Sequence, residues 1–201
     1  MTRRARTVSA AVRSAPLLVV VALAALSVPG ATAAESGTLT ANDSGLELLA
    51  EPHSSTVIVI DAVGEDCGPG ETSEREATVV SFAADPGAPS SGARLNQVVW
   101  DLGSGAAAKS FFAAQRVYQQ ERVDCGTTAK ATGLKLTKGP GGVGEARFTV
   151  TSKERIGGKT SKVVSVSIRS GPVVTALIFI DWEPGLPGTT AVAKKAVGRL
   201  S

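Results

Sequence analysis

Apolar and polar side chains alternate along several stretches of this chain, a pattern that predicts β-strands with one buried face. The alternation is clearest in residues 160–170, where Val164, Val166 and Ile168 oppose Ser165, Ser167 and Arg169. The face with the serines is polar, so we expect it to be in contact with water. Further strand-like runs cover residues 77–84, 93–102, 129–138 and 145–154.

Two other runs are apolar almost without interruption. Residues 56–63 are rich in Val and Ile, which predicts a strand buried on both faces. Residues 171–181 predict a strand in the centre of the sheet for the same reason. A short apolar element at 45–52 is expected to end at Pro52.

Residues 110–125, preceded by an alanine-rich turn, have the spacing of an amphipathic helix. Ser104 is suited to cap its first turn, and Gly126 is suited to end it. At 100° per residue, one narrow face carries Ala107, Phe111, Ala114 and Tyr118. Cys125 projects from that face toward whatever the helix packs on. A second helix is predicted at 188–200.

The order of these elements is strands, helix, strands and helix, which is typical of an α+β fold with helices covering an antiparallel sheet. No internal repeat or low-complexity linker divides the chain. Residues 46–201 are therefore predicted to form one domain, with a central helix and a C-terminal helix packed on the sheet. Residues 35–45 are small and polar and predict a flexible N-terminal segment.

The first 34 residues have the three parts of a secretory signal peptide. Four arginines precede the apolar run 17–28, and small residues follow at 31–34. The run of about 12 residues is shorter than the roughly 20 that a membrane-spanning helix needs. We expect cleavage after Ala33 or Ala34 and a secreted, extracellular protein that meets the membrane only through its leader. An uncleaved membrane anchor is the alternative.

Removal of this leader changes the net charge. The chain has 21 Lys and Arg against 18 Asp and Glu, a net charge of +3. Four of the basic residues lie in the leader, so the remainder carries about −1. Basic patches with interleaved aromatic residues are absent from the sequence. No nucleic-acid partner is therefore expected.

Both cysteines, Cys67 and Cys125, lie in the part that would be exported. An even number of cysteines outside the cell predicts a disulfide, with two free buried thiols as the alternative. The bridge would pin the end of the central helix to the loop around Cys67. A metal site is not expected, because only His53 could join the cysteines as a soft ligand.

Motifs for catalysis or for a cofactor are weak. Residues 139–144 have the form G-x-G-x-x-G, but they lie between two predicted strands, whereas a dinucleotide site must open a helix. We expect an inter-strand loop, no cofactor, no catalytic residues and no enzyme activity. A small hydrolase is an alternative, with these acidic candidates: Glu65, Glu71, Asp181 and Glu183.

Three aromatic residues are candidates for ligand contact. Trp100 and Trp182 each end a predicted strand, and Tyr118 lies on the apolar face of the central helix. Core packing is one interpretation of all three. The other is that they contact an apolar or sugar ligand, with the two tryptophans at the rim of one groove.

Three segments, 109–125, 141–148 and 163–179, followed by a C-terminal helix, resemble the PknH-like extracellular sensor domain family of actinobacteria. The resemblance covers about residues 75–200. Members lie outside the membrane on serine/threonine kinases or occur as free-standing secreted proteins. The resemblance implies an α+β domain with a cleft for an unidentified ligand and no catalytic residues. The kinase sensors carry two disulfides, whereas this chain has cysteines for one.

Together, these observations predict a secreted, non-catalytic, sensor-like binding domain acting at the cell envelope or outside the cell. Its partner would be a small molecule, a lipid or a glycan. The alternative is a secreted protein-interaction module, such as a hydrolase inhibitor, whose partner would be a secreted or envelope protein.

Overall fold

The computed structural model describes residues 37–64, 67, 70–88, 92–126, 131–156 and 158–200, and the predicted leader lies outside them. These residues form the α+β fold predicted from the sequence, with one antiparallel sheet in the order β1-β2-β3-β7-β6-β5-β4. The strands are β1 (Glu47–Ile60), β2 (Thr72–Ala83), β3 (Arg94–Asp101), β4 (Ala131–Thr137), β5 (Ala146–Ile156), β6 (Lys159–Ser170) and β7 (Val173–Ile180). The helices are α1 (Ala41–Ser44), α2 (Gly105–Cys125) and α3 (Thr189–Gly198).

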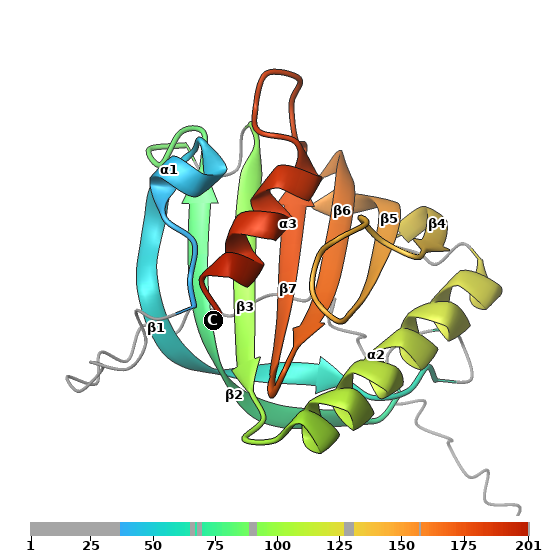
Figure 1. The fold of residues 1–201 in the computed structure, drawn as a ribbon. Helices are drawn as coiled ribbons and strands as arrows, with labels where there is room; N and C mark the ends of the chain where they lie inside the picture. Colours follow the sequence, from blue (N-terminus) through green and yellow to red (C-terminus); the bar gives the residue numbers. More distant parts are fainter. Residues whose placement is uncertain are drawn as a thin grey trace, which may run out of the picture.

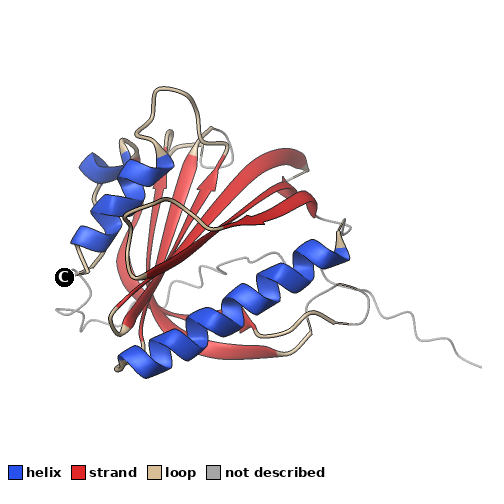
Figure 2. Ribbon diagram, turned by 45° about the vertical axis from the view of Figure 1, so that its right-hand side comes forward, coloured by secondary structure: helices blue, strands red, loops and turns tan. Residues whose placement is uncertain are grey.

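The helices lie on opposite faces of the sheet. Helix α2 lies along one face, and α1 and α3 lie on the other (Figure 2). Strand β7 is central, as predicted, and pairs with β3 on one side and β6 on the other. Strands β1 and β2 bend strongly, so that their far halves pass beneath α2 (Figure 1). The sheet therefore curls around α2 instead of lying flat against it.

Each face of the sheet has its own hydrophobic core. Because side chains of a strand alternate between faces, the same strands supply both cores. On the α3 side the cluster includes Phe82, Leu95, Ile168, Leu177, Phe179 and Val192. On the α2 side it includes Val79, Val98, Trp100, Phe111, Phe112 and Phe148.

Strand β1 differs from its prediction in two ways. It does not end at Pro52 but continues to Ile60, with register shifts between Leu48 and His53. Proline is tolerated there because β1 is an edge strand, and its missing N–H can face away from the ladder. Its second half is also buried on one face only. Val57 joins the core under α2, whereas Ile58 on the other face is 50% exposed.

The prediction of a flexible segment at 35–45 is wrong for residues 37–45, which pack on the sheet. The reason is Gln97, a fully buried polar side chain on β3. Its Oε1 accepts a hydrogen bond from the Leu39 N–H at 2.7 Å, and its Nε2 donates to the Gly37 carbonyl at 3.1 Å. Leu39 is itself buried in the α3-side core. The folded domain therefore includes residues from Gly37 onward.

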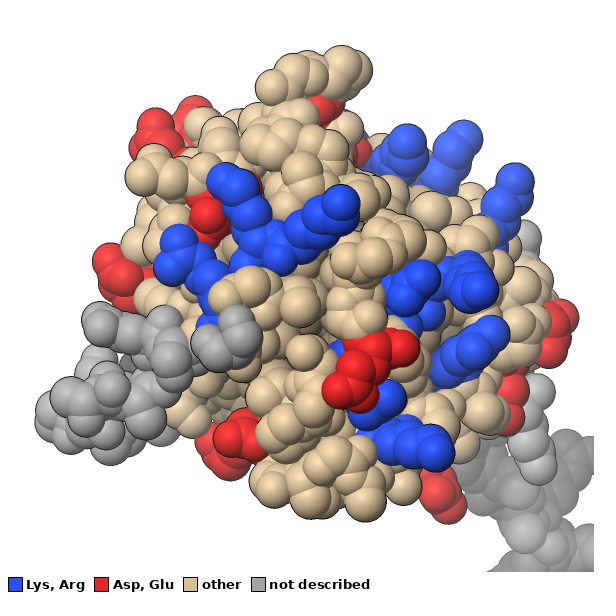
Figure 3. Space-filling view, viewed as in Figure 1, with Lys and Arg blue, Asp and Glu red and all other residues tan. Residues whose placement is uncertain are grey.

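Helix α1 is held against α3 by charge. The Asp43 Oδ2 atom accepts hydrogen bonds from the Thr40 N–H at 3.0 Å and from Arg199 Nε at 2.7 Å. Lys195 Nζ lies 3.5 Å from its Oδ1. Burial raises the pKa of Asp43, but these hydrogen bonds and the Arg199 charge outweigh it and lower the pKa. Lys and Arg side chains gather over α3, with acidic side chains beside them (Figure 3).

The glycine-rich segment is the inter-strand loop that was predicted. It joins β4 to β5 and carries Val143 into the α3-side core, where it is almost fully buried. Gly144 follows with a φ of 58° and lies so close to β6 that an added Cβ would overlap the Ile168 side chain and the Arg169 carbonyl. The glycines here serve close backbone packing.

Candidate functional site

Helix α2 forms one wall of the candidate site. Ser104 caps it as predicted, since its side chain accepts a hydrogen bond from the Ala107 N–H at 3.2 Å. The buried face is wider than the stripe predicted from the sequence and is rotated from it. Ala107 and Ala114 are exposed, whereas Ala108 and Phe112 are buried. The curl of the sheet explains this difference, because β1 and β2 contact the helix from a second side (Figure 1).

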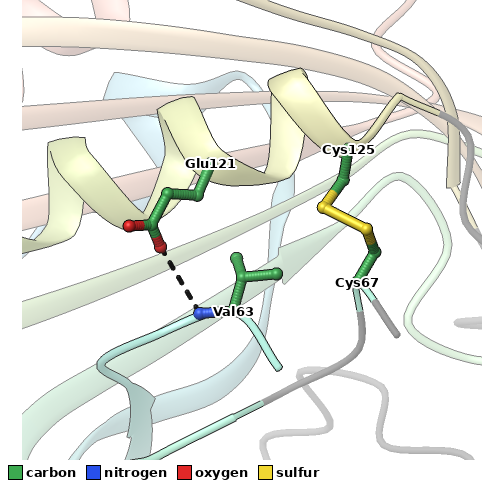
Figure 4. The surroundings of a disulfide bond; sticks show 4 residues. All are labelled: Val63, Cys67, Glu121 and Cys125. Carbon is green, nitrogen blue, oxygen red and sulfur yellow. Dashed lines mark hydrogen bonds between the residues drawn. A yellow bond between two sulfur atoms is a disulfide. The ribbon is translucent and has the colours of Figure 1, made fainter. Parts of the chain in front are cut away.

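The predicted disulfide fixes the end of this wall. Cys125, the last residue of α2, is bonded to Cys67 in the β1–β2 connection, with 5.8 Å between their Cα atoms. One helical turn earlier, Glu121 Oε2 accepts a hydrogen bond from the Val63 N–H at 3.5 Å (Figure 4). The C-terminal half of α2 is thus attached covalently to the loop that follows β1.

A cavity of about 170 Å³ lies between α2 and the curled sheet. Most of its lining is apolar and comes from β1, β3, β5, β6, β7 and α2: Val57, Ile58, Val59, Ile60, Val98, Trp100, Phe111, Phe112, Val150, Val163, Val174, Ala176 and Ile178. Polar side chains contribute the rest. An apolar lining with a few polar groups is typical of small-molecule sites.

Small side chains on the face of the sheet toward α2 leave the cavity open. Ser167 of β6 and Ala176 of β7 are direct cross-strand partners, and both line the cavity. Ser165 lies two residues before Ser167 on the same face, and neither serine hydroxyl has a hydrogen-bond partner among the described residues. On the opposite face the same two strands carry large side chains, Ile168 and Leu177, which are completely buried.

The polar groups gather where the C-terminal half of α2 faces β5. Arg122 Nη1 donates to Gln119 Oε1 at 3.0 Å, and Arg122 Nη2 lies 3.9 Å from Glu154 Oε1. Glu154 Oε1 also accepts a hydrogen bond from Ser152 Oγ at 2.8 Å. The Arg122 guanidinium carbon lies 5.8 Å from the centre of the Tyr118 ring. Burial raises the pKa of Tyr118, so its hydroxyl stays protonated at neutral pH.

Trp100 marks the other end of the cavity. Its ring is 9% exposed and packs against Phe111, with 5.4 Å between ring centres. The indole N–H is buried and has no hydrogen-bond partner among the described residues. A buried donor without a partner destabilises the fold by roughly 1–3 kcal/mol.

The three aromatic candidates are not all brought together. Trp100 and Tyr118 line the same cavity, but Trp182 lies on the opposite face of the sheet. There its ring packs edge-on against the Phe179 ring, with 4.8 Å between the ring centres. Its indole N–H donates a hydrogen bond to the Pro187 carbonyl at 3.0 Å. The prediction of a groove between the two tryptophans is wrong, because the chain after β7 turns toward α3.

Sequence reasoning missed the polar members of the cavity, Gln119, Arg122 and Glu154. Gln119 lies well outside the narrow apolar stripe predicted for the helix, and Arg122 lies at the edge of that stripe. The serines of β6 were noticed as a polar strand face and were expected to contact bulk water. A polar strand face opposite an aromatic-rich helix was the available indication of a cavity between them.

None of the described acidic candidates for hydrolysis lines the cavity. Asp181 accepts hydrogen bonds from the Lys162 N–H and from Ser161 Oγ, both at 2.9 Å, and connects β6 to the end of β7. Burial raises its pKa, but these hydrogen bonds lower it overall. Glu71 and Glu183 are exposed, and Glu65 lies outside the described residues.

Among the described residues, no group of three or more His, Cys, Asp or Glu side chains is arranged to hold a metal ion. The same part of the chain contains no helix that is long and apolar enough to cross a membrane. No family model matches the sequence, and comparison with curated proteins finds no significant match.

Proposed function

We propose that this protein is a secreted, non-catalytic domain that binds a small, largely apolar ligand between α2 and the sheet. The observation that carries the proposal is the cavity itself, kept open by small side chains on the sheet and aromatic ones on the helix. Well-packed domains seldom leave voids larger than a water molecule. A cavity of this size therefore favours a binding function.

The size and chemistry of the cavity narrow the ligand class. Its volume of about 170 Å³ is close to that of an engineered apolar cavity of about 150 Å³ that binds benzene. It is smaller than the roughly 300–1,000 Å³ of sites for drug-sized molecules. A glycan would need many hydrogen-bonding groups, whereas this lining is mostly Val, Ile and aromatic. These features favour an apolar group the size of one ring or one short chain.

Two features of the chain support the proposal that the protein is secreted. The leader pattern at residues 1–34 favours export, and the Cys67–Cys125 disulfide is suited to an oxidising compartment. The resemblance to PknH-like sensor domains also implies a ligand-binding role outside the cell.

Tryptophan fluorescence tests binding directly, because Trp100 lines the cavity and Trp182 lies on the other face. The oxidised protein would be titrated with 1-octanol as a neutral apolar probe. In a Trp182→Phe variant, the emission of Trp100 should change in a saturable way. In a Trp100→Phe variant, the emission of Trp182 should not change. An equal response from both variants, or no response, would contradict binding in this cavity.

A cavity-filling variant gives an independent check. Ala176→Leu places a larger side chain between Val98 and Ser167, its two cross-strand partners. It should abolish the octanol response while the protein stays folded. Ala191→Leu is the matched control, because Ala191 is exposed on α3 and far from the cavity lining. It should bind octanol like the parent protein.

A further inference from the structure

We propose that the ligand is an unbranched amphiphile with a carboxylate head, a medium-chain monocarboxylate, whose head group is bound by Arg122. This inference rests on the proposed function and specifies its ligand. The hydrocarbon chain would occupy the apolar part of the cavity, between α2 and the sheet. The carboxylate would lie at the polar end, beside Tyr118 and Gln119.

The hydrogen-bonding capacity of Arg122 is largely unused. A guanidinium group has five N–H donors in a planar fork that fits a carboxylate with two parallel hydrogen bonds. Among the described residues, Arg122 makes one hydrogen bond, to Gln119, while its separation of 3.9 Å from Glu154 is too long for a second. Its side chain is only 22% exposed, so water reaches little of it. An incoming acceptor would therefore satisfy donors that the protein leaves open.

The neighbouring Glu154 does not occupy this position. Its Oε1 already accepts a hydrogen bond from Ser152, and its side chain is 33% exposed at the edge of the site. It holds Arg122 near the cavity by charge without a close contact. A ligand carboxylate would compete with this loose ion pair, so removal of the Glu154 charge should favour the ligand.

The shape of the cavity favours a chain over a compact ring. Its lining on α2 extends from Phe111 to Arg122, eleven residues or about 16 Å along the helix axis. A cavity of about 170 Å³ that extends over this length of helix is a narrow slot. The polar residues Gln119, Arg122 and Glu154 lie at one end of this slot, whereas Trp100 and Phe111 line the other end.

The experiment compares three probes with the same eight-carbon chain: octanoate, 1-octanol and octylammonium. Binding is followed at neutral pH by the emission of Trp100 in the Trp182→Phe background. Octanoate should bind roughly tenfold more tightly than octanol, the factor expected for a hydrogen bond to a charged group. Equal affinity of octanol, or tighter binding of octylammonium, would overturn the carboxylate assignment.

Two variants at the polar end should act in opposite directions. Arg122→Gln should remove the preference for octanoate, so that octanoate and octanol bind with similar affinity. Glu154→Gln should strengthen octanoate binding several-fold, because it removes the competing carboxylate. A preference for octanoate that survives in Arg122→Gln would contradict the role of this residue.

The outcomes separate the two proposals. Binding of octanol and octanoate with equal affinity would refute the carboxylate head and leave the cavity as a binding site. Failure of all three probes to change Trp100 emission, in protein with an unchanged melting temperature, would refute both proposals. Octanoate binding that is insensitive to Ala176→Leu would place the site elsewhere and would also refute both.

Discussion

Replacement of both cysteines by alanine is the perturbation whose effect is best defined by this structure. Residues 67 and 125 close a loop of 58 residues, and the loop-entropy relation gives a loss of about 4 kcal/mol in unfolding free energy. Other contacts at the junction add little, because the Glu121–Val63 hydrogen bond is exposed. The loss should therefore come from the unfolded chain, with the native fold retained.

Equilibrium unfolding in urea, followed by circular dichroism, measures this loss. With a slope of about 2 kcal/mol per molar urea, typical of small domains, the midpoint should fall by about 2 M. Wild-type protein unfolded in the presence of a reductant is the control and should coincide with the double alanine variant. A midpoint shift below about 0.5 M, with the slope unchanged, would show that the bridge is not a principal source of stability and would refute the entropy argument.

Three further changes test individual contacts by the same measurement. Gln97→Leu should destabilise the fold by about 2–4 kcal/mol, because the Leu39 N–H and the Gly37 carbonyl lose their partner in the core. Gly144→Ala should lower the unfolding free energy by about 2–4 kcal/mol, because it adds a steric overlap to an unfavourable positive φ. Gly142 also has a positive φ, but an added Cβ would meet nothing within 4 Å, so Gly142→Ala should lower it by only about 1–2 kcal/mol. The pKa of Asp43 is lowered in the folded state, so its ionised carboxylate stabilises the fold above the ordinary carboxyl pKa. This stabilisation is lost as the pH falls below about 4, through the lowered pKa. In Asp43→Asn this part of the acid-induced loss of stability should be absent; an unchanged pH dependence would contradict the assignment.

The parts of the fold that the sequence predicted correctly are those fixed by neighbouring residues. Helix α2 begins after Ser104 and ends at Cys125 because a cap, a helical period and Gly126 are all local features. The central position of β7 follows from its continuous apolar run. The disulfide follows from the count of cysteines and from the leader. Each of these inferences needed no knowledge of how the sheet bends.

The errors arose where a distant residue decides the structure. Residues 37–45 are polar and were expected to be flexible, but Gln97, about 60 positions further along the chain, supplies their hydrogen-bond partners. Likewise, Gln119 lies well away from the apolar stripe predicted for α2, and Arg122 lies at the edge of that stripe. They line a cavity because β1 and β2 curl beneath α2, and local periodicity contains no information about that curvature.

The two faces of the sheet are packed differently, and the proposed function assigns stability to one face and binding to the other. On the α3 side, Ile168, Leu177 and Phe179 are fully buried under the helix. On the α2 side, the same strands present Ser167 and Ala176, and a void remains. Such a void forgoes burial worth about 0.8 kcal/mol for each missing methylene. The disulfide at Cys125 can offset this loss of stability, so α2 can stay in place over an incompletely packed core. It also restrains Arg122, which precedes Cys125 by three residues in the same helix. The opposite, well-packed face then allows the cavity to be empty or occupied without unfolding the domain.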